Sequence, residues 1–205
     1  MVTKETFNPL LRYISALPAY QNLLKFLGDK RGQPEYLAGL GLPRSARLPI
    51  LAQLYEDLQK PLLLLTNRSD RALSLFDELS FWAPEARRLY FPEPSSLFYD
   101  ETPWSQSTRR ERLQVLTDYA SYHYPGVAKP IFPPIVVAPI RAVMIRTLTR
   151  RDFLRNTTIL KPGKKISPED ILKSWIGVGY EHSNIVVQMG QFSRRGGILD
   201  IWSSG

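Results

Sequence analysis

A glycine- and arginine-containing stretch, "GLGLPRSARLPIL", has the length and setting of a phosphate-binding loop. Aligned from Gly41 with the pattern G-x-x-x-x-G-K-[ST], it carries Ala46, Arg47 and Leu48 where the pattern requires glycine, lysine and serine or threonine. It therefore lacks the hydroxyl that holds Mg²⁺ and the compact ammonium that contacts the β- and γ-phosphates. We expect neither nucleotide binding nor hydrolysis here, while weak anion binding at the N-terminus of the following helix stays open.

Other side chains suited to acid–base or metal chemistry are sparse. The chain has no cysteine and two histidines, His123 and His182, neither with partners at the spacing of a metal site or a catalytic triad. Glu93 and Asp100-Glu101 lie in a proline-rich loop, and Glu169-Asp170 lie in the first turn of an expected helix, where carboxylates favour the helix dipole. We predict no catalytic residue, no metal and no cofactor.

A basic stretch runs across the middle of the chain. It contains Arg141, Arg146, Arg150, Arg151 and Arg155. At helical spacing it is either a solvated helix face, which we favour, or a patch that contacts phosphates. The formal net charge of +8 fits an anionic partner, either nucleic acid or an acidic protein surface.

A second basic feature lies in "QFSRRGGILDIW", residues 191–202. The glycine pair ahead of the apolar run predicts a bend that leads into a β-strand, because glycine tolerates positive φ. Arg194 and Arg195 would stand beside this bend. They are either a recognition surface or a solvated turn.

Helices and strands are expected to alternate over residues 1–150, and these elements must position the residues named above. Apolar residues at helical spacing predict two short helices separated by Pro18, and another helix in "RSARLPILAQLYEDLQ". "PLLLLT" predicts a buried parallel strand, followed by the helix "SDRALSLFDELSFW". Strand and helix then recur as "RRLYFP", "STRRERLQVLTDYASYH", "PIVVAP" and "IRAVMIRTL". This alternation predicts an α/β domain with a parallel sheet.

The pattern changes beyond residue 150, where we place a domain boundary. "TTILKPG" predicts a short strand and a turn, and Ser167–Asp170 has the residues of a capped helix start. Gly177 and Gly179 should end that helix. "NIVVQ" and "GILDIW" predict two strands separated by a turn at Met189-Gly190. Residues 151–205 are expected to form a small α+β module.

The amino terminus has no signal-peptide pattern, and no run approaches the roughly 20 apolar residues of a membrane helix. The absence of cysteine is the ordinary condition of an intracellular protein. We predict a cytoplasmic protein without a membrane partner.

A long carboxy-terminal segment resembles a known domain. "RRDFLRNTTILKPGKKISPEDILKSWIGVGYEHSNIVVQMGQFSRRGGILDIW" is similar in order and spacing to the UvrA-binding domain shared by the excinuclease subunit UvrB and the transcription-repair coupling factor (Mfd) family. Within it, "FSRRGGILDIW" resembles the signature F-x-x-R-G-G-I-x-D-I-F-P. "RLYFPEPSSLFYDETPWS" and "PIVVAPIRAVM" resemble the preceding UvrB-homology domain. UvrB keeps an intact phosphate loop and coupling factors lose it, so the resemblance favours the coupling factors.

This resemblance implies an adaptor and not an enzyme. It implies a degenerate, P-loop-NTPase-like α/β domain, followed by a module that recruits UvrA to stalled transcription during nucleotide excision repair. In a complete coupling factor, further domains bind RNA polymerase and act as an ATP-dependent, helicase-like translocase on DNA. We therefore expect an amino-terminal fragment whose second domain is truncated.

The resemblance also implies where UvrA binds. In this family, arginines at the RGG strand and near the "GY" turn contact UvrA. Arg195 matches the signature arginine and Arg194 adjoins it; Phe192, Glu181 and His182 complete the expected surface. UvrB-like sequences carry an arginine within "Y-D-R", where this chain has "YEH".

The alternative hypothesis is a DNA-binding module. In that interpretation the basic stretch from Arg141 to Arg155 contacts phosphates, and the second domain is only structural. Affinity for duplex DNA that falls steeply with salt would favour it.

Overall fold

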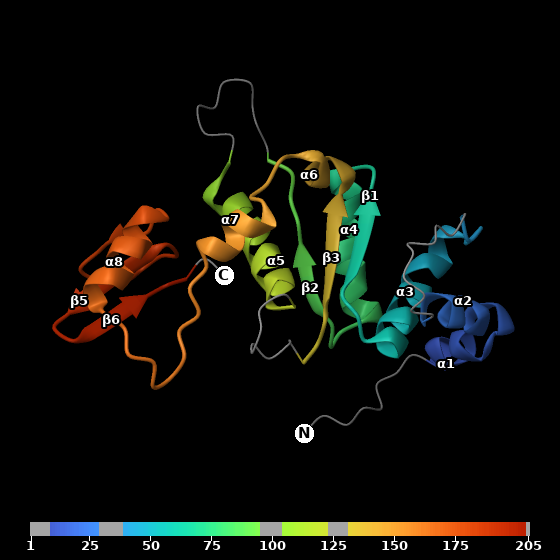
Figure 1. Cartoon of the computed structure of the whole chain (residues 1–205). Helices are drawn as coiled ribbons and strands as arrows, with labels where there is room; N and C mark the ends of the chain where they lie inside the picture. The colour runs from blue at the N-terminus through green and yellow to red at the C-terminus, as the bar shows by residue number, and fades with distance from the viewer. Residues whose placement is uncertain (1–8, 29–38, 95–103, 123–130, 204–205) are drawn as a thin grey trace.

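The computed structural model describes residues 9–28, 39–94, 104–122 and 131–203. Figure 1 shows two sheets that lie well apart from each other. The predictions for His123 and Asp100-Glu101 fall outside the described residues. In chain order the elements are α1 (Pro9–Ala16), α2 (Pro18–Gly28), α3 (Arg44–Leu58), β1 (Leu62–Thr66), α4 (Ser69–Trp82), β2 (Arg87–Tyr90), α5 (Gln106–Ser121), β3 (Pro134–Pro139), α6 (Ile140–Met144), α7 (Arg150–Arg155), α8 (Pro168–Gly177), β4 (Glu181–His182), β5 (Gln191–Arg195) and β6 (Ile198–Ile201).

The first sheet is parallel, in the order β1-β3-β2. Helix α4 connects β1 to β2, and α5 connects β2 to β3 (Figure 1). The predicted mixed fold, a parallel α/β sheet followed by a small α+β module, is confirmed. Strands that alternate with helices must run parallel when each connection crosses back over the sheet.

Strand β3 is the centre of this unit, and all six of its residues are buried. Ile135 and Val137 lie in a core cluster with residues of α1 to α4, while Val136 and Ala138 lie in a second cluster with Val115 of α5. Because successive side chains of a strand point to opposite faces, one apolar run supplies both layers. This explains why "PIVVAP" shows no polar alternation.

Strand β1 differs from the prediction of a buried strand. Within the described part of the chain it is an edge strand, paired only with β3, and its burial alternates along the strand. Leu62 and Leu64 pack against the first core cluster, whereas Leu63 and Leu65 remain 50% and 44% exposed. A continuous apolar run therefore does not distinguish a central strand from an edge strand.

A buried arginine links the second layer together. Arg112 of α5 is 3% exposed and stacks on Phe91 and Trp104, with its guanidinium carbon 3.9 and 4.9 Å from the two ring centroids. Its Nη1 donates to the carbonyls of Pro92 and Ala142, at 2.8 and 3.0 Å. Desolvation by burial lowers the pKa of Arg112. One side chain thus joins α5, the end of β2 and α6.

The small module, residues 168–202, is built from α8 and the second sheet. Ser167 caps α8 by accepting from the N–H of Asp170 at 3.3 Å, as the sequence predicts. β4 pairs in parallel with β5, and β5 pairs antiparallel with β6. Ile171 and Trp175 of α8 pack on Phe192 of β5 and form the module's core.

Three predicted elements differ from the structure in whole or in part. "IRAVMIRTL" forms only the short helix α6, which ends at Met144. "TTILKPG" is not a strand, although its turn at Pro162-Gly163 is present. "NIVVQ" is not a strand because the N–H groups of Val187 and Gln188 donate to the side-chain oxygen of Gln191, at 3.1 and 3.2 Å, and not to a neighbouring strand.

Within the described part of the chain, no helix has the length and apolar character needed to cross a membrane.

Replacing Arg112 with alanine should lower the free energy of unfolding by about 3 kcal/mol, because two buried carbonyls lose their donor and two rings lose their stacking partner. Chemical denaturation measures this change. Arg110→Ala, an exposed arginine on the same helix, is the control and should stay within about 0.5 kcal/mol of wild type. Equal effects of the two substitutions would exclude a structural role for Arg112.

Candidate protein-binding site

The β5–β6 hairpin carries both arginines of the RGG segment. Arg195 pairs with Ile198, so Gly196 and Gly197 form a two-residue turn. Gly196 has φ of 58°, and Gly197 is not among the positive-φ glycines, which fits a type II′ turn. The predicted bend before the last strand is therefore present, and it places Arg195 at the tip of the hairpin.

Arg194 and Arg195 extend from opposite faces of β5, as expected for consecutive residues of a strand. Arg194 faces α8: its Nη2 lies 3.3 Å from Oε1 of Glu169, and its Nε donates to the carbonyl of Gly196 at 3.4 Å. The pKa of the Glu169 carboxyl is lowered by a hydrogen bond from its own backbone N–H and by the nearby Arg194. Arg195 instead pairs with Asp200, with 2.5 Å between its Nη2 and Oδ2.

The face that carries Arg195 is partly apolar. Arg195 lines a cavity of about 590 Å³ together with Ile185, Asp200 and Trp202. Ile185 is 70% exposed, and Trp202 is 49% exposed. In many protein interfaces a few residues contribute most of the binding energy, and arginine and tryptophan are enriched among them. A cation beside exposed apolar side chains has the composition of such a group.

The loop between β4 and β5, residues 183–190, is tied to this face. Ser193 donates its hydroxyl to the carbonyl of Asn184 at 3.1 Å, and Ser183 donates to the carbonyl of Ile185 at 2.7 Å. Ser193 is 2% exposed, so its hydroxyl is satisfied inside the module. The loop that presents Ile185 is thereby fixed to the strand that presents Arg195.

The other residues of the expected surface lie elsewhere. Phe192 was included in that surface, but its side chain is 2% exposed and packs on Trp175, with ring centroids 5.6 Å apart. Glu181 and His182 are exposed on β4, at the opposite edge of the sheet from β6. The ring of His182 lies edge-on to Phe192. The five residues therefore do not form one continuous contact surface.

Sequence comparisons relate this chain to known proteins. Residues 158–205 match the family model of the UvrB interaction domain. The transcription-repair-coupling factor of Bacillus subtilis (strain 168) is 29% identical over 162 residues, which covers 79% of this chain. Over most of its length, the chain is similar to transcription-repair-coupling factors.

The coupling factors of Staphylococcus epidermidis (strain ATCC 35984) and Staphylococcus aureus (strain USA300) are 26% and 28% identical, over 94% and 92% of the chain. The chain spans only 13% of the length of the Bacillus subtilis coupling factor and 15% of these two.

The altered phosphate loop leads into α3. Gly41 has φ of 61°, and Ala46, Arg47 and Leu48 lie inside the helix. Leu48 is 3% exposed and belongs to the core, so an apolar side chain packs where a phosphate loop requires the hydroxyl that holds Mg²⁺. Among the described residues, no group of three or more His, Cys, Asp or Glu could hold a metal ion.

The arginines of the basic stretch do not share one helix. Arg141 lies on α6, Arg146 lies in the connection, and Arg150, Arg151 and Arg155 lie on α7. All five are exposed. Arg141 is 3.9 Å from Glu93, and the ion pairs found among the described residues include none of the other four. A single solvated helix face was therefore the wrong expectation.

Phe192→Ala should destabilise the small module, because truncating a buried phenylalanine costs about 3–5 kcal/mol. Hydrogen exchange of residues 168–202 should speed up, while exchange in β3 stays unchanged. Ile185→Ala, an exposed position in the same module, should leave exchange at wild-type rates. Unchanged protection in Phe192→Ala would contradict the assignment of Phe192 to the core.

Proposed function

We propose that this chain is the part of a transcription-repair coupling factor that recruits UvrA during nucleotide excision repair, and that the Arg195 face of the β5–β6 hairpin is the contact surface. The observation that carries the proposal is the match of residues 158–205 to the UvrB interaction domain, since this segment includes the whole hairpin. The name of that domain concerns protein interaction and not catalysis.

The geometry favours Arg195 over Arg194 as the main contact. The Arg195 side chain is 70% exposed and that of Arg194 is 41% exposed. An exposed ion pair such as Arg195–Asp200 contributes at most about 1 kcal/mol, so a carboxylate of the partner can replace Asp200 at little cost. The planar guanidinium can then hold that carboxylate through two hydrogen bonds.

The rest of the proposal concerns which part of the longer protein carries out each activity. This segment hydrolyses no ATP, because Ala46, Arg47 and Leu48 replace the residues of a phosphate loop. RNA polymerase binding and ATP-driven translocation on DNA belong to other domains of a coupling factor. The adaptor works in the bacterial cytoplasm, and its boundary with the preceding α/β domain lies near residue 150.

Arg195→Glu should weaken binding of this chain to purified UvrA by about thirtyfold or more, because losing one partner of a desolvated charge pair costs roughly 2–5 kcal/mol. Calorimetric titration measures the affinity. Arg194→Glu should weaken binding less, since its side chain faces Glu169.

Arg109→Glu is the matched control: the same charge change at an exposed position of α5 should leave UvrA affinity unchanged. Unaltered binding by Arg195→Glu would sink the assignment of the contact surface. Absence of UvrA binding by the wild-type chain would sink the adaptor function itself.

The second candidate function is DNA binding by the basic stretch, favoured by the exposure of Arg146, Arg150 and Arg151. We expect it to be secondary. A variant with these three arginines changed to serine should bind UvrA like wild type. A duplex DNA affinity that falls steeply between low and moderate salt, and that this variant abolishes, would favour the DNA-binding module instead.

A further inference from the structure

A cavity of about 650 Å³ lies at the carboxyl end of β1, between the first turns of α3 and α4. Helix α3 contributes Arg44 and Arg47, and helix α4 with the residues just before it contributes Arg68 and Arg71. We call it the α3–α4 cavity. Its lining also includes four leucines and one carboxylate, Asp70.

The charge of this cavity is strongly positive. Four arginines against one aspartate give a formal net charge of +3 for its lining. Arg68 is paired with Asp70, and Arg47 donates to the carbonyl of Leu42 at 3.4 Å. Among the described residues, the side-chain hydrogen bonds and ion pairs include the guanidinium group of neither Arg44 nor Arg71. Both are exposed, so their guanidinium groups can turn to a ligand.

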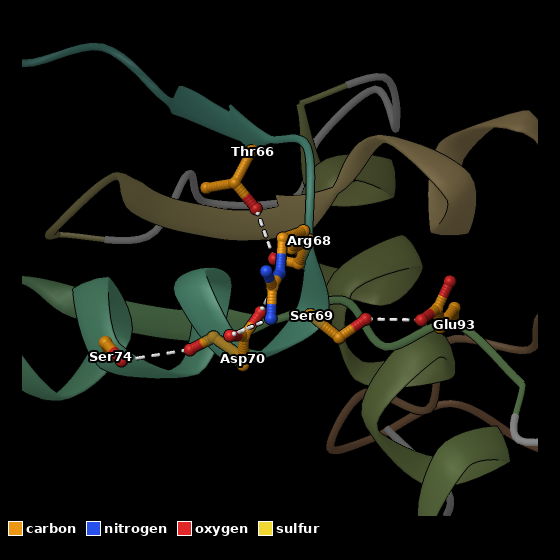
Figure 2. A network of polar contacts seen from close by, with 6 residues as sticks. All are labelled: Thr66, Arg68, Ser69, Asp70, Ser74 and Glu93. Atoms are coloured by element: carbon orange, nitrogen blue, oxygen red, sulfur yellow. Dashed lines mark hydrogen bonds and ion pairs between the residues drawn. The ribbon is translucent and has the colours of Figure 1, made fainter.

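Asp70 supplies a carboxylate to the lining of this cavity. Arg68 donates to both of its carboxylate oxygens, at 2.9 and 2.8 Å (Figure 2). These contacts, together with hydrogen bonds from the backbone N–H groups at the start of α4, lower the pKa of Asp70. Figure 2 also shows Ser69 donating to Glu93, which holds the start of α4 against the end of β2. A carboxylate thus already accepts hydrogen bonds from one arginine of this cavity, and the lining also includes Arg44 and Arg71.

We propose that the α3–α4 cavity binds a small anion with two or more phosphate groups. Guanidinium groups hold phosphate oxygens through paired hydrogen bonds, and a net charge of +3 matches a pyrophosphate better than a single carboxylate. A volume of about 650 Å³ is that of a small-molecule site. The site holds the ligand without cleaving it, because Leu48 replaces the hydroxyl of a phosphate loop.

Recognition in this cavity is directed at phosphate and not at a base. The residues that line it include leucines but no aromatic side chain on which a base could stack. The proposal therefore extends the weak anion binding that the altered phosphate loop left open, and assigns it to arginines of two helices. A nucleotide would bind through its phosphates alone.

Titration of the 205-residue chain with pyrophosphate at low ionic strength tests the proposal, because salt screens exposed charges. The double variant Arg44→Ala/Arg71→Ala should lower the affinity by on the order of tenfold or more, since each charge-assisted hydrogen bond is lost. Asp70→Asn should raise the affinity severalfold because it removes the competing carboxylate. A gain of binding cannot come from misfolding.

The matched control is Arg109→Ala/Arg110→Ala, which removes the same charge from exposed positions of α5 and should leave pyrophosphate affinity unchanged. Equal affinities for ATP and tripolyphosphate would identify free polyphosphate as the source of the phosphate groups, and tighter binding of ATP would identify a nucleotide. No binding of pyrophosphate, or equal losses in the two double variants, would overturn the proposal. Duplex DNA binding that needs Arg44 and Arg71, without pyrophosphate binding, would assign the cavity to nucleic acid.

Discussion

The fold depends on β3 being buried on both faces. Residues 135–138 of this strand pack alternately into two core clusters, and both β1 and β2 pair with it. A strand without solvent contact tolerates neither a polar side chain nor a shift in register, because a slip of one residue moves each side chain to the opposite face and so into the other core. This constraint applies directly to α4 and α6, which contact β3, and through α4 to the neighbouring helix α3.

Much of the fold was predictable because the local patterns and the tertiary structure agree. The helix expected from "SDRALSLFDELSFW" is α4, and Ser167 caps α8 as its sequence predicts. The errors arise where tertiary contacts decide. Nothing in the local sequence identifies β1 as an edge strand. The hydrogen bonds from Val187 and Gln188 to Gln191 compete with strand pairing, and the pattern of apolar residues does not reveal them.

The candidate sites, like the fold, were predictable only in part. The glycine pair correctly predicts the bend beside Arg195, but the separation of Arg194 and Arg195 onto two faces requires knowledge that both lie within β5. The α3–α4 cavity was invisible to motif analysis, since Arg68 and Arg71 are remote in sequence from Arg44 and Arg47. The fold brings the starts of α3 and α4 together at the carboxyl end of β1.

The parallel pairing of β4 with β5 has a consequence for association. Parallel neighbours usually need a connection of about a dozen residues or more, often a helix, yet here residues 183–190 suffice. Side chains of β5 hold this connection through Ser193 and Gln191, so hydrogen bonds join the apolar and cationic parts of the Arg195 face. A surface already ordered before encounter loses little conformational entropy on docking. Complexes formed on this surface should therefore dissociate slowly, and their formation should require little change in the structure of the hairpin.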